Sequence, residues 1–428
     1  MTAVLATLLV VLLAALGIPV FVLMAGLGLW LFHASGAQLA SMAIELLRLA
    51  SLPALAAIPL FTFAGFLLAE SKAPQRLLAL AEALFGWMPG GLAVVALLTC
   101  AVFTAFTGAS GVTIIALGGL LYPMLLQQRY PERFSLGLLT CTGSLGLLFP
   151  PSLAIILYGL VAGQLDPRVS IDKLFVAGAV PGLILIAALS VYCVYVGMRQ
   201  GTPRSPFAWR AVGTSARAAL WEIPLPPLII GGIYGGLFTA TDAAAVMAFY
   251  VLVVEVFVYR DIRPSDLSRI VTESMALVGA ILLVLGCALG LTYYMIDAEV
   301  PDRLFAFLNQ WVHSKTLFLV VLNALLLIVN MVEIFSAIVI VVPLLVPIAA
   351  QYGIDPIHMG VIFLLNLEIG YMTPPLGLNL FLSGRRFGQP LTKLYGSTFV
   401  FWLIHIAMLL FVTYIPALSL GLLKLRGG

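Results

Sequence analysis

The sequence EIGYMTPPLGLN at residues 368–379 does most to determine how this chain must be built. A proline pair removes two backbone N–H donors and obstructs the preceding helical turn, so a helix that contains it must unwind near its middle. A second stretch of the same kind, TGSLGLLFPPS, occupies residues 142–152. Both lie inside apolar segments, at 359–384 and 135–165. We therefore expect two broken helices whose freed carbonyl groups need partners.

An apolar stretch that is too long for one membrane crossing and too short for two precedes each broken helix. The stretch 90–126 contains the small polar run TAFTGASG at 104–111, and the stretch 317–350 contains NMVEIFS at 330–336. Two helical arms that meet at such a tip predict a re-entrant hairpin. Irregular backbone of this kind is tolerated at membrane depth only where it is buried in protein or faces a water-filled cavity.

The two hairpin–break units repeat along the chain. An ungapped shift of 224 residues places Pro123 on Pro347, Gly146 on Gly370, and both prolines of the first pair on those of the second. The same shift carries the first hairpin tip onto the second. This order predicts that the chain consists of two duplicated halves.

The composition predicts an all-α polytopic membrane protein. Of 428 residues, 62% are apolar and 9% are charged, against about 25% charged in a soluble domain. This balance, with a net charge of only +3, excludes a soluble enzyme, a secreted disulfide scaffold and a nucleic-acid binder. The four cysteines form no CxxC pair and are expected to be small core residues. Apolar segments lie at 3–32, 52–70, 90–126, 135–165, 174–197, 223–258, 275–296, 317–350, 359–384 and 395–422.

The positions of the few charges indicate that the halves are inverted. The segment 198–217 carries four arginines and no acid, which predicts a cytoplasmic location. The loop 127–133 contains two arginines, whereas its counterpart 351–358 contains no lysine or arginine. We therefore expect a first inverted repeat at 1–197, a cytoplasmic connector at 198–222 and a second repeat at 223–428. In this topology 223–258 must cross twice or re-enter, with a break at 238–242.

Inverted repeats with discontinuous helices are typical of a secondary transporter whose site lies near the membrane midplane. Unwound carbonyls and hydroxyl groups supply the hard oxygen ligands that a small cation prefers. Thr107 and Ser110 can coordinate a cation with carbonyls around Gly146 and Phe149. By symmetry a second site is expected from Gly370 and Thr373 with the backbone near Asn330. The alternative is that glycine and proline only allow kinks for packing.

Ionisable residues within the apolar segments are costly and are usually paired or functional. Glu333 lies at the second hairpin tip and Glu368 directly before the second break. For both, a role with a proton or a cation and a paired structural role remain open. Glu255, near a helix end, is expected to form an interfacial ion pair.

The histidines and the arginine pair are expected to have structural roles. His313 and His358 fall in expected loops, and His405 is expected to be a packed helix residue. Arg385 and Arg386 follow the second broken helix. We expect them to anchor the chain at the cytoplasmic edge of the membrane, in preference to the alternative that they contact a substrate carboxylate.

At these motifs the sequence resembles the large membrane subunit of TRAP transporters, the tripartite ATP-independent periplasmic family (DctM-like). The resemblance spans nearly the whole chain in family order. The matching pieces are AIPLF at 57–61, FTGAS at 106–110, GSLGLLFPPS at 143–152, GGIYGGLFTATDAAA at 231–245 and GIDPIHMGVIFLLNLEIGYMTPPLGLNLF at 353–381.

The resemblance implies sodium-driven uptake of carboxylate-bearing solutes, such as C4-dicarboxylates or sialic acids, across the bacterial cytoplasmic (inner) membrane. It implies a periplasmic solute-binding protein (DctP-like), a small four-helix membrane subunit (DctQ-like) on a separate chain, and an elevator motion of the hairpins and broken helices against a scaffold. It implies no enzymatic activity. The implied sodium ligands are Thr107, Ser110, Gly146, Phe149, Pro151, Asn330, Gly370, Thr373 and Leu376. Substrate contacts are expected from Ser144, Ser152 and Asn379.

Four positions depart from the family pattern. Asn330 stands where glycine is usual, and Glu333 where aspartate is common; Ala109 replaces a frequent serine and Ala240 a usual proline. A rival interpretation is a stand-alone divalent-anion/sodium symporter, which shares the hairpin–break architecture. A membrane-embedded enzyme is disfavoured because the sequence contains no nucleophile–base or metal-binding pattern.

Overall fold

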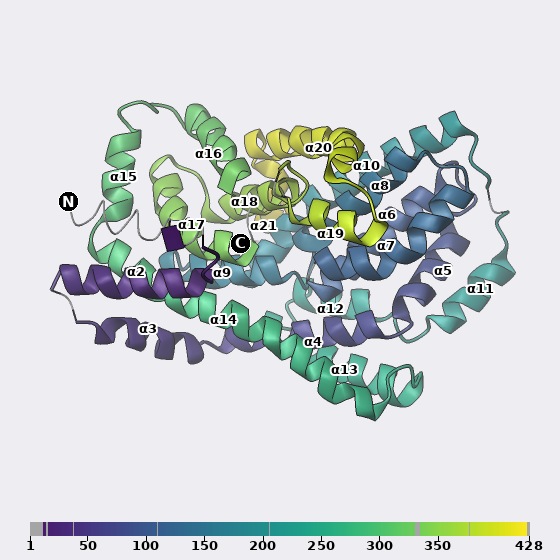
Figure 1. Ribbon diagram of the computed structural model, residues 1–428, viewed down its shortest axis with the longest axis horizontal. Coiled ribbons are helices and arrows are strands. Elements are labelled where there is room, and N and C mark those ends of the chain that lie inside the picture. Colours follow the sequence, from purple (N-terminus) through teal and green to yellow (C-terminus); the bar gives the residue numbers. More distant parts are fainter. Residues whose placement is uncertain are drawn as a thin grey trace.

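The chain folds as a bundle of helices, described here by a computed structural model (Figure 1). The structure describes residues 12–13, 16–36, 38–108, 110–204, 206–329, 334–375 and 377–425. Within these ranges there is no strand, and seven helices are long and apolar enough to cross a membrane, or eight if one bent pair counts as a single span. The expected all-α polytopic membrane fold is therefore confirmed.

The first half of the chain precedes the connector helix α11 (Trp209–Ala218). Its elements are α2 (Val20–Ala34), α3 (Ala40–Ala50), the short helix η1 (Pro53–Ala56), α4 (Ala57–Glu70), α5 (Ala73–Phe85), α6 (Gly91–Thr107), α7 (Ser110–Gln127), α8 (Glu132–Thr142), η2 (Leu145–Leu148), α9 (Leu153–Leu165) and α10 (Ile171–Gln200).

The second half follows the connector. Its elements are α12 (Leu225–Tyr234), α13 (Ala240–Val253), the π-helical turn η3 (Val254–Val258), η4 (Pro264–Asp266), α14 (Leu267–Asp297), α15 (Val300–Leu308), α16 (Lys315–Val329), α17 (Ile334–Gln351), α18 (Pro356–Gly370), α19 (Leu378–Phe387), α20 (Leu391–Tyr414) and α21 (Ala417–Leu425).

The element boundaries repeat at the spacing found in the sequence. Displaced by 224 residues, α7 coincides with α17 at both ends, and the first residues of α6 and α8 fall on those of α16 and α18. The halves also exchange contacts reciprocally, because α7 packs against α19 while α17 packs against α9. This exchange is what a two-fold relation between two similar units produces.

The first expected hairpin and both broken helices are present, and both arms of the second hairpin are helical. The arms of the first hairpin, α6 and α7, have 17 and 18 residues and pack against each other. The first broken helix bends by 41° between α8–η2 and α9. In the second, α18 ends at Gly370 and α19 begins at Leu378. The tip of the second hairpin, which includes Asn330 and Glu333, lies outside the described residues.

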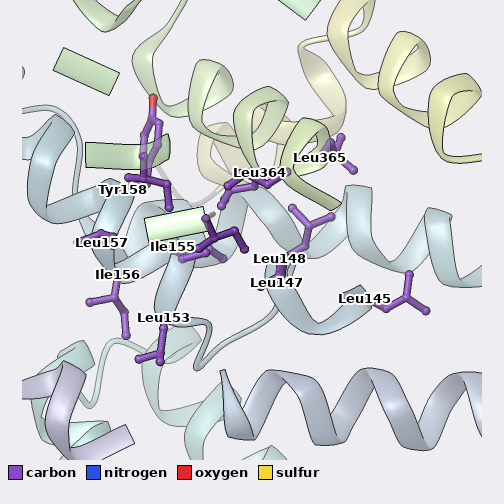
Figure 2. Packing of buried hydrophobic residues seen from close by; sticks show 14 of the residues in the cluster. Leu145, Leu147, Leu148, Leu153, Ile155, Ile156, Leu157, Tyr158, Leu364 and Leu365 are labelled. Atoms are coloured by element: carbon purple, nitrogen blue, oxygen red, sulfur yellow. The ribbon is translucent and has the colours of Figure 1, made fainter. Parts of the chain in front are cut away.

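Close helix packing holds these elements together. Lipid tails are as apolar as leucine side chains, so helices in a bilayer associate through tight packing and hydrogen bonds. Helices α8 and α20 approach so closely that a Cβ atom on Gly137 would lie 2.1 Å from the Ser397 carbonyl oxygen. Figure 2 shows the buried aliphatic cluster at the first break, where side chains from η2 and α9 lie beside Leu364 and Leu365 of α18.

A second group of helices packs along one side of this core (Figure 1). Helix α14 crosses the molecule diagonally in Figure 1 and packs against α2, α3 and α4, while α13 packs along α4. Helix α5 connects α4 to the first hairpin and packs against both α6 and α11. It therefore joins this outer group to the first hairpin along the chain, in addition to the direct packing of α4 against α6.

A buried ion cluster fixes the start of α5. The Arg76 guanidinium donates to the carboxylates of Glu222, Glu255 and Asp261, and it lies 3.9 Å from the ring centre of Tyr259. Burial disfavours the charged guanidinium, but the three carboxylates outweigh burial and raise the pKa of Arg76 above its ordinary value. The expected ion pair of Glu255 is confirmed, and its partner comes from α5.

The break expected within 223–258 is present, and the single apolar segment expected at 395–422 needs revision. The segment 223–258 is interrupted near the expected place, at Gly235–Thr239, where Thr239 and Asp242 form a capping box for α13. Its first helix, α12, has only 10 residues, roughly 15 Å of length, and is too short to cross a membrane alone. The single segment expected at 395–422 consists of two helices, because Pro416 follows the end of α20.

The expectation for His358 is wrong, and those for His313, His405 and the cysteines are confirmed. His358 is not in a loop: it is buried in α18, where its ring nitrogens lie 2.6 Å from Ser419 Oγ and 3.3 Å from the Thr413 carbonyl oxygen. The adjacent Asp355-Pro356 is a helix start, since the Asp355 side chain caps α18. His405 is a packed helix residue and His313 lies in a loop, as expected. All four cysteines are free and buried, as expected.

Candidate functional site

The tip of the first hairpin lies against the first helix break. Helix α6 ends at Thr107, and Gly108 adopts φ +64°, a conformation that favours glycine and lets the chain turn directly into α7 at Ser110. The turn η2 packs against α6 so closely that a Cβ atom on Gly146 would lie 2.2 Å from the Ala105 backbone nitrogen. The structure thus brings together the tip and the break that the sequence analysis paired.

The oxygen atoms at this junction suit a small cation. The Thr107 Oγ1 atom is buried and has no hydrogen-bond partner among the described residues, and Ser110 is also buried. The Gly146 carbonyl accepts from the Phe149 N–H at 3.1 Å, and the Phe149 carbonyl accepts from the Ser152 N–H at 3.0 Å. Each carbonyl keeps a second lone pair. An orphaned hydroxyl beside such carbonyls is the donor set expected for a hard cation.

Two threonines that the sequence analysis did not select support this junction. Thr104 Oγ1 lies 2.8 Å from Thr113 Oγ1 and donates to the Gly143 carbonyl at 3.3 Å. These bonds connect both hairpin arms to the end of α8. Their signal in the sequence is spacing: each lies one helical turn from Thr107 or Ser110 and on the same side of its helix.

The second candidate cation site is described only in part. Gly370 closes α18, and its carbonyl accepts from the Thr373 N–H at 3.1 Å. The Thr373 hydroxyl donates to the Ile369 carbonyl at 2.7 Å and accepts from Trp402 Nε1 at 3.0 Å. Its oxygen therefore has one lone pair left for a ligand. The other expected ligands, Asn330 and Leu376, lie outside the described residues.

The expected substrate residues connect the two halves. Asn379 Nδ2 donates to the Thr140 carbonyl at 3.1 Å and lies 3.4 Å from Ser144 Oγ. Asn379 Oδ1 is buried and unpartnered among the described residues, so it can still accept a hydrogen bond. Ser152 plays a different part, since its side chain caps α9 by accepting from the Ile155 N–H. The broken helices thus meet through Ser144 and Asn379.

The other residues singled out from the sequence lie near the two breaks. Glu368 is fully buried, and neither of its side-chain oxygens has a partner within the described part of the chain. Pro151 is buried in the first break, beside the partly exposed Phe149. Arg385 and Arg386 are exposed at the end of α19.

An apolar cavity of about 240 Å³ flanks the first break. Phe149 and Pro150 line it on one side, α6 and α10 line it on two more, and Pro226 and Ile230 of α12 close it. No hydrogen bond or ion pair joins these lining side chains across it in the described structure. The surface between the break and α12 is therefore apolar.

Comparison with known proteins identifies the family. The family description "Tripartite ATP-independent periplasmic transporter, DctM component" matches residues 6–418. The chain belongs to the DctM family. It is therefore the large permease subunit of a TRAP transporter, a membrane transport component and not an enzyme.

Named relatives of this DctM protein span several solutes. The C4-dicarboxylate TRAP transporter large permease protein of Pseudomonas aeruginosa is 37% identical over 384 residues, which is 89% of each chain. The 2,3-diketo-L-gulonate large permease protein of Escherichia coli is 33% identical, over 76% of this chain and 75% of that one. The isethionate permease protein DctMQ of Oleidesulfovibrio alaskensis is 33% identical, over 85% of this chain and 57% of that one.

The fold is also similar to a solved transporter. The crystal structure of the Alcanivorax borkumensis YdaH transporter superposes with a TM-score of 0.61 at 14% identity, covering 89% of this chain and 88% of that one. At this identity the likeness concerns the fold alone.

Proposed function

We propose that this DctM subunit carries out sodium-coupled uptake of a carboxylate-bearing organic acid across the bacterial inner membrane. The observation that carries the proposal is the junction of the first hairpin tip with the first break. There the buried, unpartnered Thr107 hydroxyl ends the helix that η2 packs against, and the Gly146 and Phe149 carbonyls of the break each keep one lone pair.

Neutral oxygens favour sodium over a divalent ion at this junction. Divalent cations prefer sites that include carboxylates, whereas the candidate ligands here are hydroxyls and carbonyls. The proposed ligands of the first ion are Thr107, Ser110 and the backbone of Gly146, Phe149 and Pro151. Those of the second are Gly370, Thr373, Asn330 and Leu376. The 224-residue correspondence of the helices supports two equivalent ions.

The substrate class rests on the relatives and on the junction between the halves. The relatives named above transport C4-dicarboxylate, 2,3-diketo-L-gulonate and isethionate, all organic anions. Ser144 and Asn379 join the two broken helices; the Ser144 hydroxyl can donate to a carboxylate, and the unpartnered Asn379 Oδ1 can accept from a substrate hydroxyl or coordinate a cation. We infer that an organic acid binds here, where the cations neutralise its charge.

Two partner proteins belong to the proposal. A periplasmic solute-binding protein delivers the substrate, and a small four-helix membrane subunit completes the permease. The DctMQ relative supports the second partner, because this chain covers only 57% of that longer protein.

Transport proceeds by an elevator motion in this proposal. The hairpins and broken helices form the moving unit, and helices such as α4, α13 and α14 form the scaffold. The apolar cavity between the first break and α12 supports this division, since such a surface offers little resistance to sliding.

The test is uptake into vesicles that contain the purified chain with both partners, under an imposed sodium gradient. Ser110→Ala and Thr373→Ala remove one proposed ligand each, and both should raise the sodium concentration needed for half-maximal uptake by roughly tenfold. Thr272→Ala is the matched control, because Thr272 is exposed on α14 and bonds only within its own helix. Unchanged sodium dependence in both site variants would sink the assignment.

The stand-alone divalent-anion/sodium symporter predicts a different outcome. It requires sodium-driven uptake by this chain without either partner. The TRAP proposal requires no uptake under that condition, so the same vesicles separate the two.

A further inference from the structure

The connector between the halves carries an unpaired basic surface. Arg199, Arg204, Arg210 and Arg217 are all exposed, and none forms an ion pair in the part of the chain that the structure describes. No acidic residue occurs between positions 198 and 217. We call residues 199–217 the basic connector. In a chain with only 9% charged residues, four unpaired arginines within nineteen positions are a concentrated positive charge.

Helix α11 within the basic connector has two different sides. Ala211 and Ser215, one turn apart, face α5 across a cavity of about 300 Å³ that Ala79 and Ala83 also line. Arg210 and Arg217 are seven residues apart and therefore share another side of the helix. Glu82 of α5 lines the same cavity and makes no ion pair with these arginines.

Exposed aromatic side chains accompany the arginines. Trp209 is 79% exposed and Phe207 is 43% exposed, and their ring centres lie 5.0 Å apart. The membrane-spanning helix α10 ends at Gln200, where Gly201 adopts φ +60°. The aromatic pair therefore follows the end of a membrane helix along the chain, and aromatic and basic side chains at such a position are typical of contact with lipid headgroups. In Figure 1, α11 lies at the right-hand edge of the molecule beside α5.

We propose that the basic connector binds anionic phospholipid headgroups at the membrane face where α10 ends, and that this contact holds α5 in place. Charge complementarity selects the partner, because basic residues at a membrane surface attract anionic lipid by roughly fivefold in binding each. The aromatic pair selects a lipid surface over a soluble anion, since its exposed rings need an apolar neighbour.

The contact with α5 gives lipid binding a mechanical consequence. Helix α5 connects α4 to the first hairpin, and α11 packs along it. Beyond α11 the chain reaches Glu222, which binds Arg76 at the start of α5. A headgroup bound to the connector thus restrains α5 from one side while the ion cluster restrains it at one end.

The proposal is tested by lipid-dependent thermal stability of the purified chain in detergent, a readout that does not require transport. Added phosphatidylglycerol should raise the melting temperature more than added phosphatidylcholine. The combined Arg204→Gln, Arg210→Gln and Arg217→Gln variant should lose this difference, and the corresponding three Arg→Lys changes should retain it. A control variant with Arg133→Gln, Arg263→Gln and Arg303→Gln removes the same charge from exposed, unpaired positions elsewhere and should also retain it.

A second measurement covers the case in which the triple variant does not fold. Quenching of tryptophan fluorescence by brominated phosphatidylglycerol should be stronger in the native chain than in Trp209→Phe, and 0.5 M salt should weaken it. Equal responses to the two lipids, or a glutamine variant that keeps the phosphatidylglycerol response, overturns the proposal. An equal stabilisation by inorganic phosphate also overturns it, because the surface then binds a soluble anion.

Discussion

Gly146→Ala is the substitution that tests the geometry of the first cation site most severely. A Cβ atom at this position would lie 2.2 Å from the Ala105 backbone nitrogen and 2.6 Å from the Thr104 carbonyl carbon. An ordinary contact begins at 3.4 Å, so η2 and α6 must separate by roughly 1.2 Å. The obstructing atoms belong to a helix backbone, which cannot rotate away as a side chain does.

This displacement acts on both stability and ion binding. Overpacking a close-packed interior costs about 1–3 kcal/mol, and a clash with backbone belongs at the upper end of that range. The same shift moves the carbonyls of the break away from Thr107, and a misplacement of about 1 Å at a site can cost up to ~100-fold. We expect the sodium concentration for half-maximal uptake to rise at least tenfold, with a lower melting temperature in detergent.

The assay pairs sodium titration of vesicle uptake with thermal unfolding of the same preparation. Gly279→Ala in α14 is the control, since a Cβ atom there has nothing within 4 Å; it should leave the sodium dependence unchanged and should not lower the melting temperature. A folded Gly146→Ala variant with native sodium dependence would refute the reasoning, because the break could then move without disturbing the ion.

Three further substitutions test the packing around the site. Arg76→Leu leaves the buried Glu222 and Glu255 without their cation and should lower the free energy of unfolding by about 3–5 kcal/mol, measured by chemical denaturation. Adding Glu255→Gln to this variant should restore part of the lost stability, and a loss below about 1 kcal/mol for Arg76→Leu contradicts the cluster's role. Asn379→Leu leaves the Thr140 carbonyl unpaired and should cost about 1–3 kcal/mol while weakening substrate affinity in uptake assays, whereas Asn309→Leu at an exposed position should change neither. Tyr158→Phe removes one hydrogen bond to the Pro356 carbonyl and should cost only about 1 kcal/mol in thermal unfolding; a loss as large as that of Arg76→Leu would mean that this bond does more than join α9 to α18.

The sequence predicts correctly those helices whose ends or breaks are marked by glycine and proline. The first hairpin was expected at 90–126 and spans Gly91–Gln127, because its tip contains residues that cannot continue a helix in an apolar segment. The two proline pairs located both breaks for the same reason. The 224-residue shift followed from these positions and coincides with the boundaries of α7 and α17.

Surface helices escaped the sequence analysis because they do not resemble membrane spans. Helices α3, α5, α11 and α15 have 9 to 13 residues with polar and apolar sides, whereas the search for spans selects long, uniformly apolar segments. The expectation of a loop at His358 is wrong because this residue lies just before the apolar segment 359–384, yet Asp355-Pro356 already begins a helix there through the Asp355 cap.

Contacts between residues far apart in the chain could not be predicted from the sequence either. Arg76 meets Glu222 across 146 positions, and Asn379 meets Ser144 across 235. Nothing in the local sequence pairs such residues, because their meeting depends on how the two halves dock. The support given by Thr104 and Thr113 was missed for a similar reason, since a hydroxyl in an apolar helix bonds equally well to its own preceding turn.

The central claim is sodium-coupled transport by a three-part system, and its most direct test is vesicle uptake with the partners and gradients varied independently. With the small membrane subunit and the binding protein both present, an inward sodium gradient should drive accumulation of a radiolabelled C4-dicarboxylate or a related organic acid that the binding protein recognises. Removal of either partner, or collapse of the sodium gradient, should abolish it. Accumulation by this chain alone, or accumulation driven equally well by a proton gradient without sodium, would contradict the account.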